Sequence, residues 1–247
     1  VADIRRDPPP LPEGEIAEGT SFLEWLADDH FTFLGCREYV FEGEGEEAMA
    51  KVVAGSGLGI LRSDETTIFA QSRSLGPMPA RSRRFLRRRE LLVISKAGRR
   101  STVHRPVHLD AVSAKLFSAD GEVIGHRLFV GLFTSLAYAA RASEIPVLRR
   151  KVEGVLERSR IPLDGHGGKA LIHILDTYSR DELFQITEEE LTEIAIGILH
   201  LQERYRIAFF PRKDTFERYV SCLVYVPRDR FDTRLRLKLQ EILSAAY

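Results

Sequence analysis

The chain has 247 residues, of which 44% are hydrophobic, with 36 acidic and 36 basic side chains. That length allows one large or two ordinary domains around a real apolar core. The balanced charge excludes a global field toward nucleic acid or membrane, and the longest apolar run, residues 128–140, is too short to span a bilayer.

The first elements are predicted from a change in the spacing of apolar residues along the chain. Residues 1–19 contain three consecutive prolines and several charges, which predict a tail or linker. Thr20 and Ser21 then open a short helix, because Ser21 and Glu24 have the spacing of a capping box. From Phe31 to Phe41 the apolar period is two, which predicts a strand followed by a turn.

Short strands dominate the rest of the first half. A hairpin turn is expected at 119–121, and the pattern over residues 20–142 predicts an α+β sensor-like domain built on an antiparallel sheet, of PAS or GAF type. The strands that follow the first are expected at Leu58–Arg62, Thr67–Ala70, Leu91–Lys96, Val103, Asp110–Phe117 and Glu122–Phe133.

From Ser143 the apolar period becomes 3.6. Ser143 is expected to cap a helix, with Pro146 in its first turn, where a missing N–H has no cost. A second helix is expected from about Gly168 to Tyr178. Residues 143–180 are therefore predicted to be a helical connector.

The last part, residues 181–247, predicts the order β-α-β-β-α. Leu183–Ile186 is taken as the first strand, and Thr187 with Glu190 forms a second capping box that opens a helix. Strands at Arg206–Pro211 and Arg218–Val226 and a helix capped by Asp232 complete the order. This is an incomplete ferredoxin-like, or ACT-like, unit, in which Leu183–Ile186 would be an open edge that favours self-association.

Two cysteines, Cys36 and Cys222, lie far apart in apolar alternating runs. Neither belongs to a C-x-x-C motif or lies near a histidine at metal-ligand spacing. They are predicted to be buried small hydrophobic residues without a disulfide, which favours a reducing, cytosolic compartment.

The segment H-x3-H-x-D, formed by His104, His108 and Asp110, offers the ligand types of a metal or anion site. An extended chain would spread the outer two residues by roughly 20 Å. A shared ion would therefore need a bend at Arg105–Pro106, and a structural polar cluster is the favoured interpretation. No catalytic, cofactor-binding or metal-binding residue is assigned.

Two glycine-rich segments and one arginine cluster carry weaker signals. Gly55–Gly59 lacks dinucleotide-loop spacing and precedes a strand, so a flexible loop is predicted. Gly165–Ala170 lacks the first glycine and the Ser/Thr of a Walker A loop, so a helix entry is predicted. The arginines of residues 81–89 can grip phosphates, but a solvated arm or a docking surface for another part of the protein fits the neutral chain better.

Four segments carry a family resemblance. They are FTFLGCREY (31–39), HRPVHLD (104–110), KALIHILDTYSRDELFQ (169–185) and ERYVSCLVYVPRDRFDTRLR (217–236). They closely resemble the large bacterial NAD-specific glutamate dehydrogenases, in order and with similar spacing from about Ser21 to Tyr247. In that family such segments precede the catalytic domain.

The resemblance implies a non-catalytic regulatory or scaffolding segment of a cytoplasmic enzyme that uses NAD, with no cofactor held by this chain. Its partners would be the rest of the polypeptide, like subunits and an amino acid or other metabolite effector, without nucleic acid or membrane. Val1 in place of Met and a helical pattern at the C-terminus favour a piece of a longer protein. The alternative is a free-standing PAS- or ACT-like sensing or interaction module.

Overall fold

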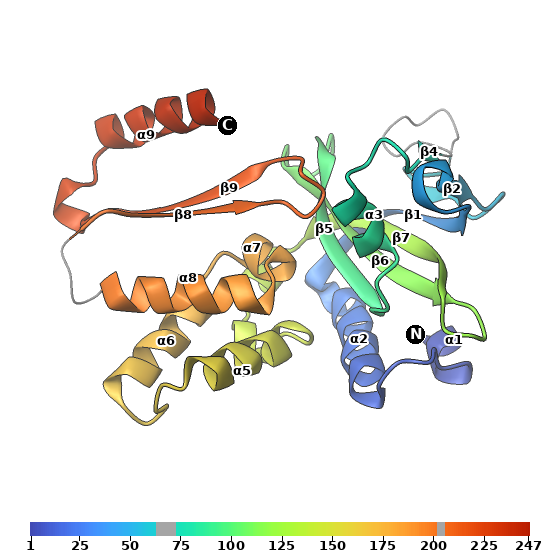
Figure 1. Cartoon of the computed structure of the whole chain (residues 1–247), viewed down its shortest axis with the longest axis horizontal. Helices are drawn as coiled ribbons and strands as arrows, with labels where there is room; N and C mark the ends of the chain where they lie inside the picture. Colours follow the sequence, from blue (N-terminus) through green and yellow to red (C-terminus); the bar gives the residue numbers. More distant parts are fainter. Residues whose placement is uncertain (63–72, 202–205) are drawn as a thin grey trace. The chain divides into compact units, whose positions relative to one another are not determined.

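The structure is a computed structural model that describes residues 1–62, 73–201 and 206–247. The chain divides into two compact units, residues 1–150 and 151–247 (Figure 1). The division lies near the start of α5 (Leu148–Ser159), whereas the sequence predicted boundaries at 142/143 and 180/181. The chain is a mixed α and β protein, as predicted.

The first unit is built on one curled antiparallel sheet. Its path is β4-β2-β1-β7-β6-β5, and β3 pairs with β1 beside this path. The strands are β1 (Phe31–Glu42), β2 (Met49–Val52), β3 (Leu58–Gly59), β4 (Arg73–Ser74), β5 (Leu92–Arg100), β6 (His108–Phe117) and β7 (Val123–Phe133). The predicted strands at β1, β5, β6 and β7 are confirmed, as is the hairpin turn, in which Gly121 has φ +81°.

A β-bulge in β1 sets which side chains enter which core. The register with β7 shifts between Phe33 and Gly35, so that Leu34 is the extra residue. Phe31 and Phe33 therefore share a face of the sheet with Cys36, whereas Arg37 lies on the opposite face.

Each face of the sheet carries its own core. On one face, Trp25 lies 6.3 Å from the ring of Phe133, which meets Phe31 edge-on at 5.2 Å. On the other face, Ala97, Leu109 and Leu132 form a buried cluster against which Leu34 and Ile60 pack.

Short helices accompany the sheet. Helix α2 lies against it in Figure 1, and the Glu15 carboxylate accepts a hydrogen bond of 2.8 Å from the Leu91 N–H. The helical segments of this unit are α1 (Ala2–Arg6), α2 (Glu13–Trp25), η1 (Leu26–His30), η2 (Gly45–Glu47), α3 (Ala80–Leu86), α4 (Ser135–Ala139) and η3 (Ala142–Glu144).

The predicted tail over residues 1–19 is wrong for its second half. Helix α2 begins at Glu13, directly after Pro12, and two glutamates in its first turn favour the positive end of the helix dipole. The expected capping box of Ser21 and Glu24 therefore lies inside the helix. The proline-rich composition concealed a helix that packs through Gly19, Thr20 and Phe22.

Three further expectations differ from the structure of the first unit. The helix expected from Ser143 begins at Leu148, after the turn η3 and after Val147, which has φ +71°. Val103 lies in the loop between β5 and β6 rather than in a strand, and the strand expected at Leu58–Arg62 is only Leu58–Gly59. The strand expected at Thr67–Ala70 lies outside the described residues.

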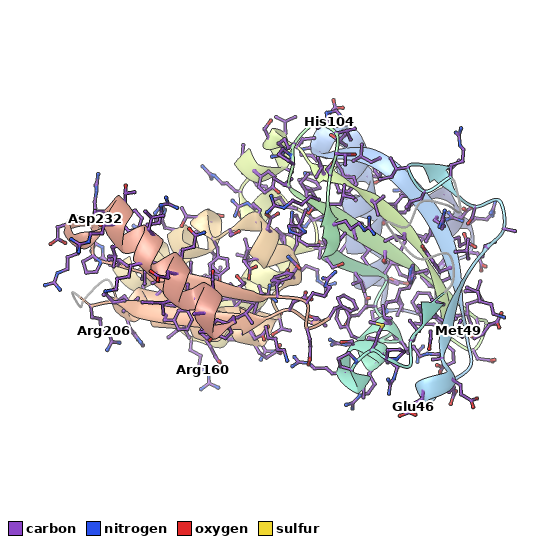
Figure 2. The ribbon with its side chains drawn as sticks, turned by 90° about the horizontal axis from the view of Figure 1, so that it is seen from above. Glu46, Met49, His104, Arg160, Arg206 and Asp232 are labelled. Carbon is purple, nitrogen blue, oxygen red and sulfur yellow. The ribbon has the colours of Figure 1, made fainter. Side chains whose placement is uncertain are left out.

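The second unit joins helices to one β-hairpin. The Thr187 capping box is confirmed, since Thr187 N–H donates to the Glu190 carboxylate and Glu190 N–H donates to Thr187 Oγ1, each at 3.2 Å. Asp232, which is labelled in Figure 2, caps the last helix, because its carboxylate accepts a hydrogen bond of 2.6 Å from Leu235 N–H. The elements after α5 are α6 (His166–Thr177), α7 (Arg180–Gln185), α8 (Glu188–Leu201), β8 (Ala208–Lys213), β9 (Val220–Tyr225), η4 (Arg228–Arg230) and α9 (Thr233–Ala246).

The strand expected at Leu183–Ile186 is wrong, because this segment is part of helix α7 and its exit. Asp181 and Glu182 occupy the first turn, where acidic side chains are favoured. A four-residue apolar run does not distinguish a strand from one turn of a buried helix. The order of the last part is therefore helices, then a hairpin, then one helix.

Candidate functional site

The H-x3-H-x-D segment does not form one cluster. His104 is exposed on the loop between β5 and β6, with φ +62° (Figure 2). His108 begins β6, and its Nδ1 lies 3.1 Å from the Ala97 carbonyl oxygen. Within the described residues, no group of three or more His, Cys, Asp or Glu side chains could hold a metal ion.

Asp110 is the buried member of this segment, with 2% of its surface exposed. One carboxylate oxygen lies 2.6 Å from Lys96 Nζ on the neighbouring strand β5, and the other accepts a hydrogen bond of 3.1 Å from Phe133 N–H. Asp110 thus ties β5 and the end of β7 to β6. It supports the interpretation of these residues as structural.

The arginine cluster is largely engaged within the first unit. Arg83 donates to the carbonyls of Gly76 and Met78, each at 2.6 Å, and Arg87 donates to Gly43 O at 2.5 Å while it covers the Phe41 ring. Further contacts of the cluster are an ion pair between Arg88 and Glu90 at 2.8 Å and a hydrogen bond from Arg89 to Pro10 O at 3.2 Å. These arginines hold loops around α3.

Lys115 lies on strand β6 and contacts the same region around α3. Its Nζ donates to Phe85 O at 3.2 Å and to Arg88 O at 2.5 Å, at the end of α3. The side chain is buried, and burial lowers the pKa of Lys115 to about 8. Both of these hydrogen bonds go to backbone carbonyls, so the ammonium group of Lys115 holds the end of α3 against the sheet.

The two glycine-rich segments have different roles. Gly165 is the N-cap of α6, which confirms the predicted helix entry. Gly55 and Gly59 have positive φ, of +75° and +59°, and Gly59 belongs to the two-residue strand β3. Neither segment has the strand, loop and helix order of a nucleotide-binding loop.

Both cysteines are free thiols, and both are half-buried, whereas the sequence predicted that they are buried. Cys36 faces the α2 side of β1, and burial raises the pKa of its thiol. Cys222 lies in β9, and burial raises its pKa as well.

A polar contact network joins the hairpin β8–β9 to the helices of the second unit. Arg212 is 5% exposed, and its Nε lies 2.7 Å from the Glu182 carboxylate on α7. Beside this pair, Tyr219 Oη donates a hydrogen bond of 2.5 Å to Gln185 Oε1. The Arg212 Nη2 group is buried without a hydrogen-bond acceptor.

In the same region the pKa of the Tyr178 phenol is raised, and side-chain contacts hold the turn between β8 and β9. Burial, together with the charge of Glu182, raises the pKa of Tyr178 to about 12. In the turn, the Asp214 carboxylate receives Arg218 Nε at 2.8 Å and Phe216 N–H at 3.1 Å. The hairpin is thus fixed both to the helices and within itself.

Sequence reasoning missed this network. Alternation places Arg212 on the same face of β8 as Phe210, which contacts α8, but the strand was expected to end at Pro211, one residue before this arginine. Its partner was hidden because Glu182 was expected just before a strand at Leu183–Ile186 rather than in helix α7. Among the described residues, no helix is long and apolar enough to cross a membrane.

Two family models match successive segments of the chain from residue 145 onward. Residues 145–204 match the family described as glutamate dehydrogenase, helical motif 1. Residues 208–247 match the family described as glutamate dehydrogenase, ACT2 domain. The network of Arg212 and Tyr219 therefore connects one matched segment to the other.

Curated relatives match nearly the whole chain. NAD-specific glutamate dehydrogenase of Halomonas elongata is 40% identical over 235 residues, which cover 92% of this chain and 14% of that protein. The protein of the same name from Pseudomonas aeruginosa is 38% identical over 94% of this chain and 14% of its own length. That of Mycobacterium tuberculosis is 32% identical, over 90% of this chain and 12% of its own length.

Proposed function

Because the chain belongs to the NAD-specific glutamate dehydrogenase family, we propose that it is a non-catalytic regulatory and scaffolding segment of such an enzyme. The whole cytoplasmic enzyme would convert L-glutamate, NAD and water to 2-oxoglutarate, ammonia and NADH. The observation that carries the proposal is the match of 92% of the chain to only 14% of a relative that bears this name.

The placement of the charged groups supports the non-catalytic part of the proposal. Asp110, Lys115 and Arg212 are among the buried charged side chains, and each makes contacts to backbone or to a neighbouring element. The glycine-rich segments form a turn and a helix entry. The NAD site is therefore assigned to the rest of the enzyme.

The two-segment architecture of the second unit supports the regulatory part. An ACT-like segment that is joined to helices by buried polar contacts can pass a change in its own position to those helices. The proposed partners are like subunits, the rest of the polypeptide and a metabolite effector such as an amino acid. A PAS-like role of the first unit belongs to the same proposal.

The proposal is tested by assaying NAD reduction with L-glutamate on the purified chain. We expect no turnover above a buffer control, while a full-length relative assayed in parallel is active. Turnover that follows the chain through purification would contradict the proposal. The reading frame after codon 247 is a second test, since a free-standing sensing module requires a stop codon and a segment of the enzyme requires a long continuation.

A further inference from the structure

Val147 has an unusual backbone conformation for its side chain. Its φ is +71°, in the left-handed region that β-branched residues rarely enter. It follows Pro146 in a turn, at a position where a positive φ normally requires glycine or asparagine. The backbone is therefore strained at this residue, and strain of this kind persists only where surrounding contacts hold it.

One carboxylate of helix α2 supplies such contacts. Glu18 Oε2 accepts a hydrogen bond of 2.9 Å from Val147 N–H, and Glu18 Oε1 accepts one of 2.6 Å from Arg149 Nε. The Glu18 side chain is only 14% exposed. Hydrogen bonds to an ionised group that is largely removed from water are stronger than those of an exposed ion pair.

The residues on either side of Val147 are restrained by other means. Ile145 precedes a proline, which confines it to extended backbone, and its φ and ψ are −83° and +122°. The ring of Pro146 fixes its own φ, and Leu148 is the first residue of α5. A change in the direction of α5 would therefore have to be absorbed at Val147.

This turn lies directly before the division of the chain into two compact units. The first unit ends at Arg150, and α5 continues across the division to Ser159. Three residues before Glu18 on the same helix, the Glu15 carboxylate binds Leu91 N–H, directly before β5. Helix α2 therefore contacts both the beginning of a sheet strand and the turn that leads into α5.

We propose that residues 145–149 are a strained joint, which Glu18 holds in one conformation and through which a shift of α2 changes the direction of α5. In the held conformation Val147 is in the left-handed region. When the carboxylate leaves, Val147 relaxes to the extended backbone that valine favours, and α5 turns with it. The joint rests on the regulatory role proposed above and gives that role a place in the chain.

The two opposing contributions are of similar size, which is what a switchable element requires. Backbone strain of this kind disfavours a conformation by about five- to a hundredfold in population. Two hydrogen bonds to a carboxylate favour it by a similar factor. The side chains of Ile145 and Leu148 are buried in the held conformation, which makes it the predominant one.

The first experiment measures hydrogen exchange at the amide of residue 147. Glu18→Ala removes both acceptor oxygens and should lower the protection factor of this amide by at least about tenfold. Glu15→Ala is the matched control, because it removes another carboxylate of α2 that binds a backbone N–H. It should lower the protection of Leu91 and leave that of residue 147 unchanged.

The second experiment tests the strain itself. Asparagine enters the left-handed region more readily than valine does. Val147→Asn should therefore raise the protection factor of residue 147 by about fivefold, and it should restore most of the protection lost in Glu18→Ala. A hydrogen bond that only added stability would not be rescued by this substitution.

The third experiment follows α5. Spin labels at Asp120→Cys and Glu153→Cys, both exposed positions, are introduced in a chain whose two native cysteines are serine. Glu18→Ala should shift or broaden the distribution of distances between the labels, and Val147→Asn added to it should reverse the change. Circular dichroism checks folding, and Glu18→Gln, which keeps an acceptor for Val147 N–H, replaces Glu18→Ala if that variant does not fold.

Three results would overturn the joint: unchanged protection of residue 147 without the Glu18 carboxylate, lower protection in Val147→Asn, or one distance distribution in all folded variants. The joint and the proposed function fail separately. NAD reduction by the chain would contradict the non-catalytic role without changing exchange at residue 147, whereas unchanged exchange would remove the joint and leave that role in place.

Discussion

Asp110 and Lys96 form an ion pair across β5 and β6, with 2.6 Å between Oδ1 and Nζ, and only 3% of the aspartate side chain is exposed. The second carboxylate oxygen is occupied by Phe133 N–H. A buried pair of this kind contributes little net stability relative to an apolar replacement, but removal of one partner leaves the other charge buried and uncompensated. The segment that first suggested an ion site is instead a point of structural vulnerability.

Asp110→Asn should therefore lower the free energy of unfolding by about 2–4 kcal/mol. Glu42→Gln is the matched control, since Glu42 pairs with Lys51 at 2.5 Å while both side chains are about half exposed. Such an exposed pair contributes about 0–1 kcal/mol. Urea denaturation of both variants measures the difference, and equal losses would contradict the assignment.

The Thr187 capping box should be worth about 1 kcal/mol to the second unit. Thr187→Ala removes the Oγ1 acceptor of Glu190 N–H, which leaves an N–H at the start of α8 without its side-chain partner. Thr192→Ala serves as control, because Thr192 Oγ1 donates to Glu188 O within the same helix. We expect a lower denaturation midpoint for the first variant and little change for the second; the reverse order would refute the cap.

Gly197→Ala should destabilise the packing of α8 on the hairpin. A Cβ atom at this position would lie 2.8 Å from the Phe210 ring, which would have to move. The expected loss is about 1–2 kcal/mol, after the gain of up to about 1 kcal/mol from better helix propensity.

Gly14→Ala provides the comparison for Gly197→Ala. The nearest atom to its added Cβ is Arg150 Nη1 at 3.8 Å, so only the propensity gain remains. Thermal melting should move in opposite directions for the two variants. Adding Phe210→Leu should recover part of the loss in Gly197→Ala, and an absence of any recovery would show that the ring is not the obstacle.

Lys115 should make stability rise with pH in the alkaline range. The pKa of this lysine is about 8 in the folded chain because of burial, whereas an unfolded lysine has a pKa near 10.4. Between these values the unfolded state binds more protons, so the free energy of unfolding increases with pH. The group contributes about 2 kcal/mol between pH 7.5 and 9.5.

Lys115→Met isolates that contribution, because methionine fills similar space without titrating. Urea denaturation of both proteins at the two pH values gives a double difference that removes the other titrating groups. The lysine protein should gain about 2 kcal/mol more than the variant. A double difference near zero would mean that the folded pKa is not depressed.

Several elements were predictable because one local signal determined each of them. The alternation of β1, the Thr187 capping box and the Asp232 cap specify their elements without help from distant residues. The amphipathic period of α8 likewise fixes its buried face. In these places propensity, pattern and capping agree.

The remaining elements depend on contacts between distant residues. Helix α2 is supported by Leu91, whose N–H is bound by Glu15 from 76 positions away. Helix α3 carries four charged or polar residues in seven and is held by loop carbonyls rather than by an apolar stripe. The pairing of Arg212 with Glu182 likewise joins residues 30 positions apart, and no local pattern encodes such a distance.

Because Leu34 is an extra residue in β1, the odd-numbered side chains before it and after it lie on opposite faces of the sheet. Before it, the odd-numbered Phe31 and Phe33 turn toward the α2 side; after it, the odd-numbered Arg37 and Tyr39 turn the other way. Because the bulge absorbs the extra residue, deletion of Leu34 would leave a regular strand in which Phe33 and Cys36 still share a face and the register with β7 is unchanged. What the extra residue supplies is one more side chain, beside that of Ile60, against the buried cluster of Ala97, Leu109 and Leu132.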